Sequence, residues 1–279
     1  MSSINLYKTK DKKRFAMNLV KGLICIIASG LLSFSALANQ PDDPPAGTEV
    51  VDTAKTETPQ KDQNDVIDKI TSSKAEILMI IDKSGSMYSL TDDTIGGFNS
   101  MIKKFRDKKF TARVSTVFFN DKVQVIHDRQ DLDSIKDITT NEYRADGTTA
   151  LLDAVGSSLT KLSAYPDLKE AKDTQVIVVI ITDGMENSSK EYQKSTIKTM
   201  IENHQKEGWK FVFLGADIDA AHEAATMGIN PDNAVKYKKT GSGVRANYEA
   251  VVDFAEAAMA PADVNGEQSD WKKKIEKDE

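Results

Sequence analysis

Three short runs of apolar residues stand out in the chain and predict buried strands. The runs are AEILMII at Ala75–Ile81, QVIVVIIT at Gln175–Thr182 and WKFVFLG at Trp209–Gly215. Unbroken apolarity over this length is typical of a strand that is covered on both faces in a parallel sheet. We therefore expect a sheet with layers packed on both of its sides.

Amphipathic stretches with helical spacing separate and follow these runs. They cover Thr94–Arg106, Ala150–Leu162, Lys190–Lys206, Asp217–Met227 and Val244–Met259. Strands that alternate with helices imply right-handed crossovers between parallel strands. The predicted fold class is therefore α/β, with a doubly wound, mostly parallel sheet and helices on both faces.

One segment departs from this alternation. Residues Ala112–Asp128 contain two strand-like runs with Asn120-Asp121 between them. Such a dipeptide between two apolar runs is a hairpin signal. We expect it to add one antiparallel strand, at an edge of the sheet.

The first 38 residues have the pattern of a secretory signal. A basic stretch to Arg14 precedes the apolar run GLICIIASGLLSF, and Ala36-Leu37-Ala38 supplies small residues before a cleavage point at Asn39. The alternative is an uncleaved anchor, but Lys21 limits the apolar run to well under the roughly 20 residues that span a bilayer. We predict export to the periplasm or the outside of the cell, with no membrane insertion after cleavage.

The remaining chain divides into a linker, a folded domain and a tail. Residues 39–73 are rich in proline, threonine and charge, and they are either a stalk that holds the domain away from a surface or a remnant between signal and fold. Residues 74–260 form the predicted domain. Residues 261–279 are charged and predict a frayed tail, with a short partner-binding helix as the alternative.

Charge and cysteine content exclude several classes of protein. The chain has 37 basic and 43 acidic residues, and removal of the signal, which holds six basic residues and one acidic residue, takes the net charge from -6 to -11. Such a surface repels nucleic acid and anionic lipid. The only cysteine, Cys25, lies in the signal, so the exported chain has no disulfide, thiolate metal site or cysteine nucleophile.

Polar residues follow the predicted strands at the points where the chemistry of such folds is found. Asp82-Lys83-Ser84-Gly85-Ser86 comes directly after the first apolar run, and Asp183-Gly184 comes after the second. In an open parallel sheet the ligand crevice lies at the carboxyl ends of the strands. Gly85 allows the first turn to curl so that two hydroxyls point the same way.

A third polar loop, Gly147-Thr148-Thr149-Ala150, opens a helix and offers another hydroxyl. Two carboxylates and three hydroxyls are hard oxygen donors, which suit a small hard cation such as Mg²⁺ and do not suit zinc or copper. Each residue alone has an ordinary explanation as a helix cap or a partner of loop amides. Their joint position at strand ends favours a metal site.

These residues resemble the von Willebrand factor type A domains and their metal-ion-dependent adhesion site. The resemblance rests on ILMIIDKSGSM, GTTALLDAV and VIVVIITDGMENSS, in the family's order, and extends from about Ala75 to Ala260. The segment GWKFVFLGADIDA is similar to a bacterial branch of the family. The resemblance implies a Rossmann-like sheet of about six strands in the order 3-2-1-4-5-6.

The resemblance also implies roles for individual residues. Ser84 and Ser86 would bind Mg²⁺, or Mn²⁺, directly, and Asp82 and Asp183 would act mostly through water. Thr149 matches the family's threonine because it stands five residues before Ala154, whereas Thr148 fills the neighbouring loop position. The last coordination position would go to an Asp or Glu of a protein partner, which makes the function metal-dependent binding or adhesion.

A magnesium-dependent hydrolase of phosphate esters is the alternative class. Against it, Ser84 stands where a second carboxylate would be needed two residues after Asp82, and no general base joins the cluster. The histidines His127, His204 and His222 are expected away from the metal turn. No G-x-S-x-G elbow or phosphate-binding loop is present in the sequence. We therefore expect a binding protein rather than an enzyme.

Overall fold

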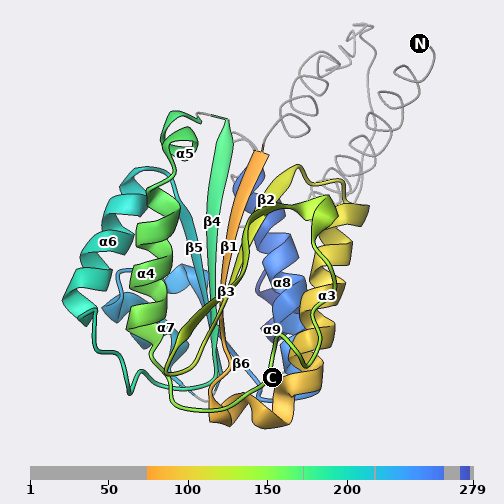
Figure 1. The fold of residues 1–279 in the computed structure, drawn as a ribbon, viewed down its shortest axis with the longest axis vertical. Helices are drawn as coiled ribbons and strands as arrows, with labels where there is room; N and C mark the ends of the chain where they lie inside the picture. Colours follow the sequence, from red (N-terminus) through yellow and green to blue (C-terminus); the bar gives the residue numbers. More distant parts are fainter. Residues whose placement is uncertain (1–73, 172, 217, 261–270, 277–279) are drawn as a thin grey trace, which may run out of the picture. The chain divides into compact units, whose positions relative to one another are not determined.

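A six-stranded sheet with helices on both faces forms the described part of the chain (Figure 1). The computed structural model describes residues 74–171, 173–216, 218–260 and 271–276. The predicted signal at 1–38 and linker at 39–73 lie outside the described residues.

The strand order is β3-β2-β1-β4-β5-β6. All neighbouring pairs are parallel except β2 and β3, which form an antiparallel hairpin at the edge. The predicted α/β class, the edge hairpin and the strand order are confirmed. The strands are β1 Lys74–Asp82, β2 Ala112–Phe119, β3 Val123–Asp131, β4 Thr174–Thr182, β5 Lys210–Ala216 and β6 Ala234–Tyr237.

The apolar runs did not reveal β6, because its four residues include only two consecutive apolar ones before Lys236. The helices agree better with the pattern of the sequence. They are η1 Gly85–Leu90, α3 Thr91–Asp107, η2 Leu132–Ser134, α4 Leu151–Ser163, α5 Pro166–Glu170, α6 Lys194–Lys206, α7 Ala220–Thr226, η3 Pro231–Asn233, α8 Gly241–Met259 and α9 Lys273–Glu276.

Two of these helices begin later than expected, each for a local reason. Helix α6 begins at Lys194 rather than Lys190, because the Asp153 carboxylate accepts hydrogen bonds from the backbone amides of residues 190–192 and holds them in a loop. Helix α7 begins at Ala220, where Asp219 caps it by accepting from the His222 amide at 3.0 Å. Side-chain caps of this kind fix where a helix starts.

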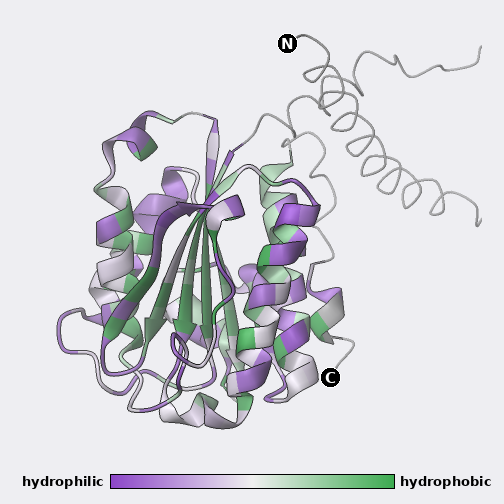
Figure 2. Ribbon diagram, turned by 45° about the vertical axis from the view of Figure 1, so that its right-hand side comes forward, coloured by the Kyte–Doolittle hydropathy of each residue, from purple (hydrophilic) through white to green (hydrophobic). Residues whose placement is uncertain are grey.

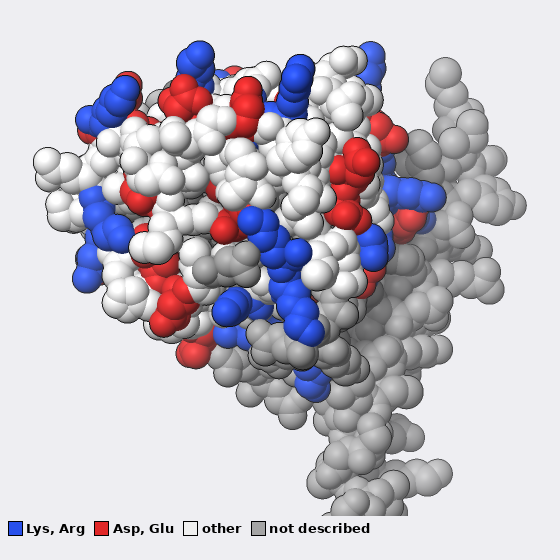
Figure 3. Space-filling view, turned by 90° about the horizontal axis from the view of Figure 1, so that it is seen from below, with Lys and Arg blue, Asp and Glu red and all other residues white. Residues whose placement is uncertain are grey.

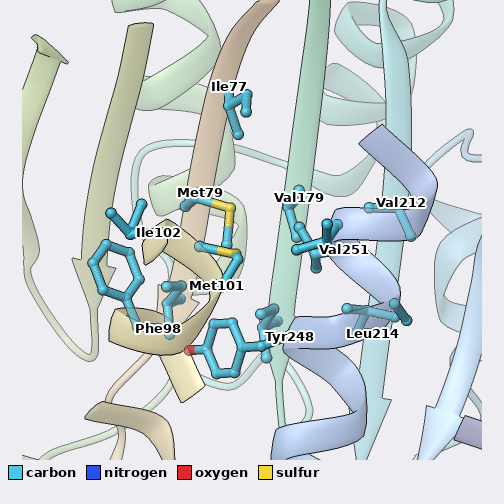
Figure 4. Close-up of a cluster of buried hydrophobic side chains, with 14 of the residues drawn as sticks. Ile77, Met79, Phe98, Met101, Ile102, Val179, Val212, Leu214, Tyr248 and Val251 are labelled. Atoms are coloured by element: carbon cyan, nitrogen blue, oxygen red, sulfur yellow. The ribbon is translucent and has the colours of Figure 1, made fainter. Parts of the chain in front are cut away.

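The core has two layers, one on each side of the sheet (Figure 1). Alternate residues of β1 supply both layers: Met79 faces α3 and α8, and Ile80 faces the layer that includes α4 and α6. Figure 4 shows Met79 and Val179 against Met101 and Val251 in the first layer. Figure 2 shows the apolar colouring along the strands between the helices. This double burial is why the strands read as unbroken apolar runs.

The described end of the tail differs from the frayed segment that the sequence predicted from residue 261. Trp271 and Ile275 are 5% and 1% exposed. The Trp271 ring packs edge-on against Phe254 of α8, with 5.2 Å between ring centroids. Both side chains belong to the core on the α3 and α8 side of the sheet, so residues 271–276 pack against the domain.

No helix among the described residues combines the length and the apolarity needed to cross a membrane.

Candidate metal centre

Three loops meet at the carboxyl ends of β1 and β4, at the bottom of Figure 1. The two strands are neighbours in register, with Ile81 opposite Ile181, so Asp82 and Asp183 leave the sheet side by side. The third loop is held to the first by a hydrogen bond from the Gly85 amide to the Gly147 carbonyl, at 3.0 Å. Residues from three distant parts of the sequence are thereby gathered at one edge.

Asp82 ends β1 as a fully buried carboxylate, 0% exposed. One oxygen accepts from the Ser84 amide at 2.6 Å, and the other accepts from the Thr182 hydroxyl at 2.7 Å. Burial raises the pKa of Asp82 to about 6, although both hydrogen bonds favour the charged form. These two donors are neutral, so this carboxylate retains its attraction for a cation.

The hydroxyls of Ser84 and Ser86 lie next to each other and next to the second carboxylate. Their oxygens are 3.0 Å apart, and the Ser86 hydroxyl donates to Asp183 Oδ1 at 2.5 Å. Ser84 and Asp183 are buried, at 2% and 3% exposure. Three of the five side chains predicted to surround one cation are therefore in contact.

Thr149, rather than Thr148, faces this group. Thr149 is buried and Thr148 is exposed. A side chain at Gly184 would begin 3.5 Å from the Thr149 hydroxyl and 3.7 Å from the Ser86 hydroxyl, so the glycine leaves the space beside both oxygens open. The five residues predicted as metal ligands are thus brought to one place.

Two residues that the sequence reading did not single out hold these loops in position. The Asn187 side-chain oxygen accepts from the Thr149 backbone amide at 2.9 Å, and the Asn187 backbone amide donates to the Thr149 carbonyl at 3.0 Å. Glu186 accepts from the Leu152 amide at 2.9 Å, at the start of α4. The acidic and polar run after Asp183-Gly184 could have indicated this role in the sequence, because such side chains commonly accept hydrogen bonds from the free amides at helix starts.

Lys239 was also missed. It follows β6 in sequence, and its ammonium lies 2.8 Å from Asp183 Oδ2, without the angles of a hydrogen bond. The Asp183 side chain is 0% exposed and that of Lys239 is 27% exposed. A lone lysine in a polar segment carries no signal in the sequence that would place it here. The contact shows that the Asp183 carboxylate attracts a positive group.

The donor set fits a hard divalent cation. It consists of three hydroxyls and two carboxylates, all oxygen, which suits Mg²⁺ or Mn²⁺. The described residues contain no group of three or more His, Cys, Asp or Glu side chains that could hold a metal, and the oxygens gathered here include hydroxyls. The histidines lie elsewhere: His127 on β3, His204 on α6 and His222 on α7.

Comparison with protein families identifies the family of this chain. The model of the von Willebrand factor type A domain matches residues 76–248. This range contains the loops of Asp82, Thr149 and Asp183. A search of curated proteins finds no match.

Solved structures share the fold at low sequence identity. The pilus adhesin SpaC from Lactobacillus rhamnosus GG is 10% identical with a TM-score of 0.52, over 67% of this chain and 30% of that chain. The vWF domain of the pilus tip protein Mfa5 from Porphyromonas gingivalis is 10% identical with a TM-score of 0.50, over 71% and 99%. Proximal thread matrix protein 1 from the mussel byssus, with a zinc-occupied MIDAS motif, is 18% identical with a TM-score of 0.49, over 67% and 46%. This chain therefore spans less than half of the mussel protein that it matches.

Proposed function

Because this chain belongs to the von Willebrand factor type A domain family, we propose that it is an exported protein that binds partner proteins through a divalent cation. The cation would capture an Asp or Glu carboxylate of the partner. The single observation that carries the proposal is the contact of the Ser84 and Ser86 hydroxyls with each other and with Asp183. Two separate loops meet there to present oxygens in one place.

The chemistry of these oxygens explains why the bound cation would attract a carboxylate of the partner. Ser84, Ser86 and Thr149 would hold Mg²⁺ or Mn²⁺ directly, and Asp82 and Asp183 would act through water. Neutral hydroxyls leave most of the positive charge on the cation, so the cation supplies strong attraction for an incoming anion. The hydrogen bonds from Ser84 and Thr182 keep Asp82 in place at the base of the site.

Binding without catalysis is part of the proposal. Hydrolysis of a phosphate ester needs a group that accepts or donates a proton near the metal. Ser84 occupies the position two residues after Asp82, and the three histidines lie on β3, α6 and α7. No observation on the described residues favours the hydrolase. An assay for hydrolysis therefore accompanies the test of metal binding.

We also propose that the protein is located in the periplasm or outside the cell, which the signal pattern at residues 1–38 supports. SpaC and Mfa5 are pilus proteins by name. Their likeness to this chain concerns the fold alone, so an adhesive role here rests on the chemistry of the site.

The proposal is tested by titrating Mg²⁺ into the purified protein in a calorimeter. The double variant Asp82→Ala, Ser84→Ala is expected to weaken binding by at least about tenfold, since even residues that only orient metal ligands contribute this much. Thr148→Ala is the matched control, because it removes an exposed hydroxyl beside Thr149. Normal Mg²⁺ binding by the double variant would refute the site.

The same protein is assayed against phosphate esters with Mg²⁺. We expect no turnover. Robust hydrolysis that disappears in Asp82→Ala would replace the binding proposal with an enzymatic one.

A further inference from the structure

Four large apolar side chains are exposed among the described residues. Tyr88 is 76% exposed and Met185 is 67% exposed, while Val123 and Val125 on the edge strand β3 are 38% and 44% exposed. Single exposed apolar residues are ordinary on a protein surface. The two most exposed ones, however, are not scattered over the surface at random.

Tyr88 and Met185 both belong to the loops of the candidate metal centre. Tyr88 stands two residues after Ser86, within η1, and Met185 stands two residues after Asp183. Two residues of chain span at most about 7 Å between α-carbons. Because the Ser86 hydroxyl is bonded to Asp183 at 2.5 Å, both apolar side chains start close to the same group of oxygens.

Neither side chain contributes to the packing of the domain core. In η1 the core positions are filled by Met87 and Leu90, which are 1% and 3% exposed, and Tyr88 lies between them on the outside. The loop of Met185 is fixed by its neighbours instead, through the bonds of Glu186 and Asn187 to the start of α4. Both apolar groups are therefore presented to solvent on loops that are held in place.

Fixed, exposed Tyr and Met side chains suit recognition. Tyr and Met are enriched in protein interfaces, and Met adapts to differently shaped partners. A rigid presentation lowers the entropy lost on binding. Figure 3 looks onto this end of the molecule and shows uncharged residues between the charged side chains.

We propose that Tyr88 and Met185 form an apolar rim that selects a partner segment in which the metal-binding Asp or Glu is flanked by large apolar residues. The inference rests on the proposed function, since the rim acts only on a segment whose carboxylate the cation holds. The metal would then supply the common anchor. The rim would decide between acidic segments of different neighbours.

The test uses three synthetic peptides displayed densely on beads, so that weak contacts are measured together. Their centres are Leu-Asp-Phe, Ser-Asp-Ser and Leu-Asn-Phe, and retention of the protein is measured with Mg²⁺ and with chelator. With Mg²⁺, Leu-Asp-Phe is expected to retain the protein about tenfold better than Ser-Asp-Ser, which is the scale of one good interface residue. Leu-Asn-Phe, and every peptide with chelator, should retain little.

The double variant Tyr88→Ser, Met185→Ser should lose this preference while binding Mg²⁺ like the parent in the calorimeter. Its matched control is Val123→Ser, Val125→Ser, which removes the other two exposed apolar side chains and should keep the preference. Equal, metal-dependent retention of both Asp peptides by the parent would overturn the rim but leave the proposed function standing. Failure of all Asp peptides, with normal Mg²⁺ binding, would overturn both.

Discussion

Strand β1 carries a buried carboxylate near each of its ends, and the two have different surroundings. Glu76, near the amino end, is 2% exposed and accepts from the Arg129 guanidinium at 2.9 Å. Asp82, at the carboxyl end, is 0% exposed and accepts from neutral donors, the Ser84 amide and the Thr182 hydroxyl. Burial raises the pKa of both acids.

The difference separates a structural carboxylate from one that is available to a ligand. Arg129 neutralises Glu76 and also pairs with Asp167 at 2.7 Å, so the amino-end cluster has its own counter-charge. At the carboxyl end, hydroxyl and amide donors stabilise Asp82 without cancelling its charge. A buried charge without a fixed partner is costly. The cation that we propose at this end would supply the missing counter-charge.

The largest effect is expected when the amino-end cluster is broken. Arg129→Met removes the guanidinium and leaves Glu76 buried without its counter-charge, which should lower the free energy of unfolding by about 3 to 5 kcal/mol. Urea denaturation measures the loss. Mg²⁺ binding by the folded variant should be unchanged, because Arg129 lies on β3 and takes no part in the metal loops.

Arg113→Met is the matched control for this cluster. Arg113 pairs with the same Asp167 at 3.1 Å, but its side chain is 48% exposed. Exposed ion pairs contribute about 0 to 1 kcal/mol. Equal losses in the two arginine variants would contradict the view that burial of Glu76 is what makes Arg129 important.

A smaller effect is expected at the carboxyl end, where Lys239 would compete with the proposed metal. Its ammonium lies 2.8 Å from Asp183 Oδ2, and a cation that uses this carboxylate must displace it. Breaking a partly exposed ion pair costs up to about 1 kcal/mol, or about fivefold in an equilibrium constant. Lys239→Met should therefore raise the affinity for Mg²⁺ about fivefold in the calorimeter.

Lys236→Met serves as the control for Lys239, because Lys236 is an exposed lysine on the neighbouring strand β6. It should leave the affinity unchanged. Weaker Mg²⁺ binding by Lys239→Met would show that the ammonium supports the site instead of competing for it.

The smallest effect concerns the pH dependence of the amino-end cluster. The Arg129 guanidinium lowers the pKa of the Asp167 carboxyl to about 2. Because the folded pKa is below the unfolded value of about 3.9, the stabilisation is present above about pH 4 and is lost as the pH falls toward 2. Asp167→Asn should thus be less stable than the parent at pH 6, and urea denaturation at pH 6, 4 and 3 should show the gap narrowing. A gap that stays constant with pH would contradict the pairing.

Much of this fold was readable from the pattern of the sequence. The unbroken runs at Ala75–Ile81 and Gln175–Thr182 identified central strands, because burial on both faces leaves no polar positions. The four residues of β6 escaped notice, since so short a segment has no measurable period. The start of α6 also escaped notice, because Asp153, far away in sequence, holds the preceding amides.

For the candidate site, the sequence by itself determined which oxygens are present and that each follows a strand or opens a helix. Spacing within a turn is local, so Asp82, Ser84 and Ser86 needed no other part of the chain to be recognised. The family resemblance already favoured Thr149 over Thr148, and in the structure Thr149 is buried beside Ser86 while Thr148 is exposed. Tertiary structure alone decided that Lys239 reaches Asp183. It also decided that Arg129 neutralises Glu76. Contacts between distant segments depend on how the helices and loops pack onto the sheet, and the order of residues along the chain does not record that.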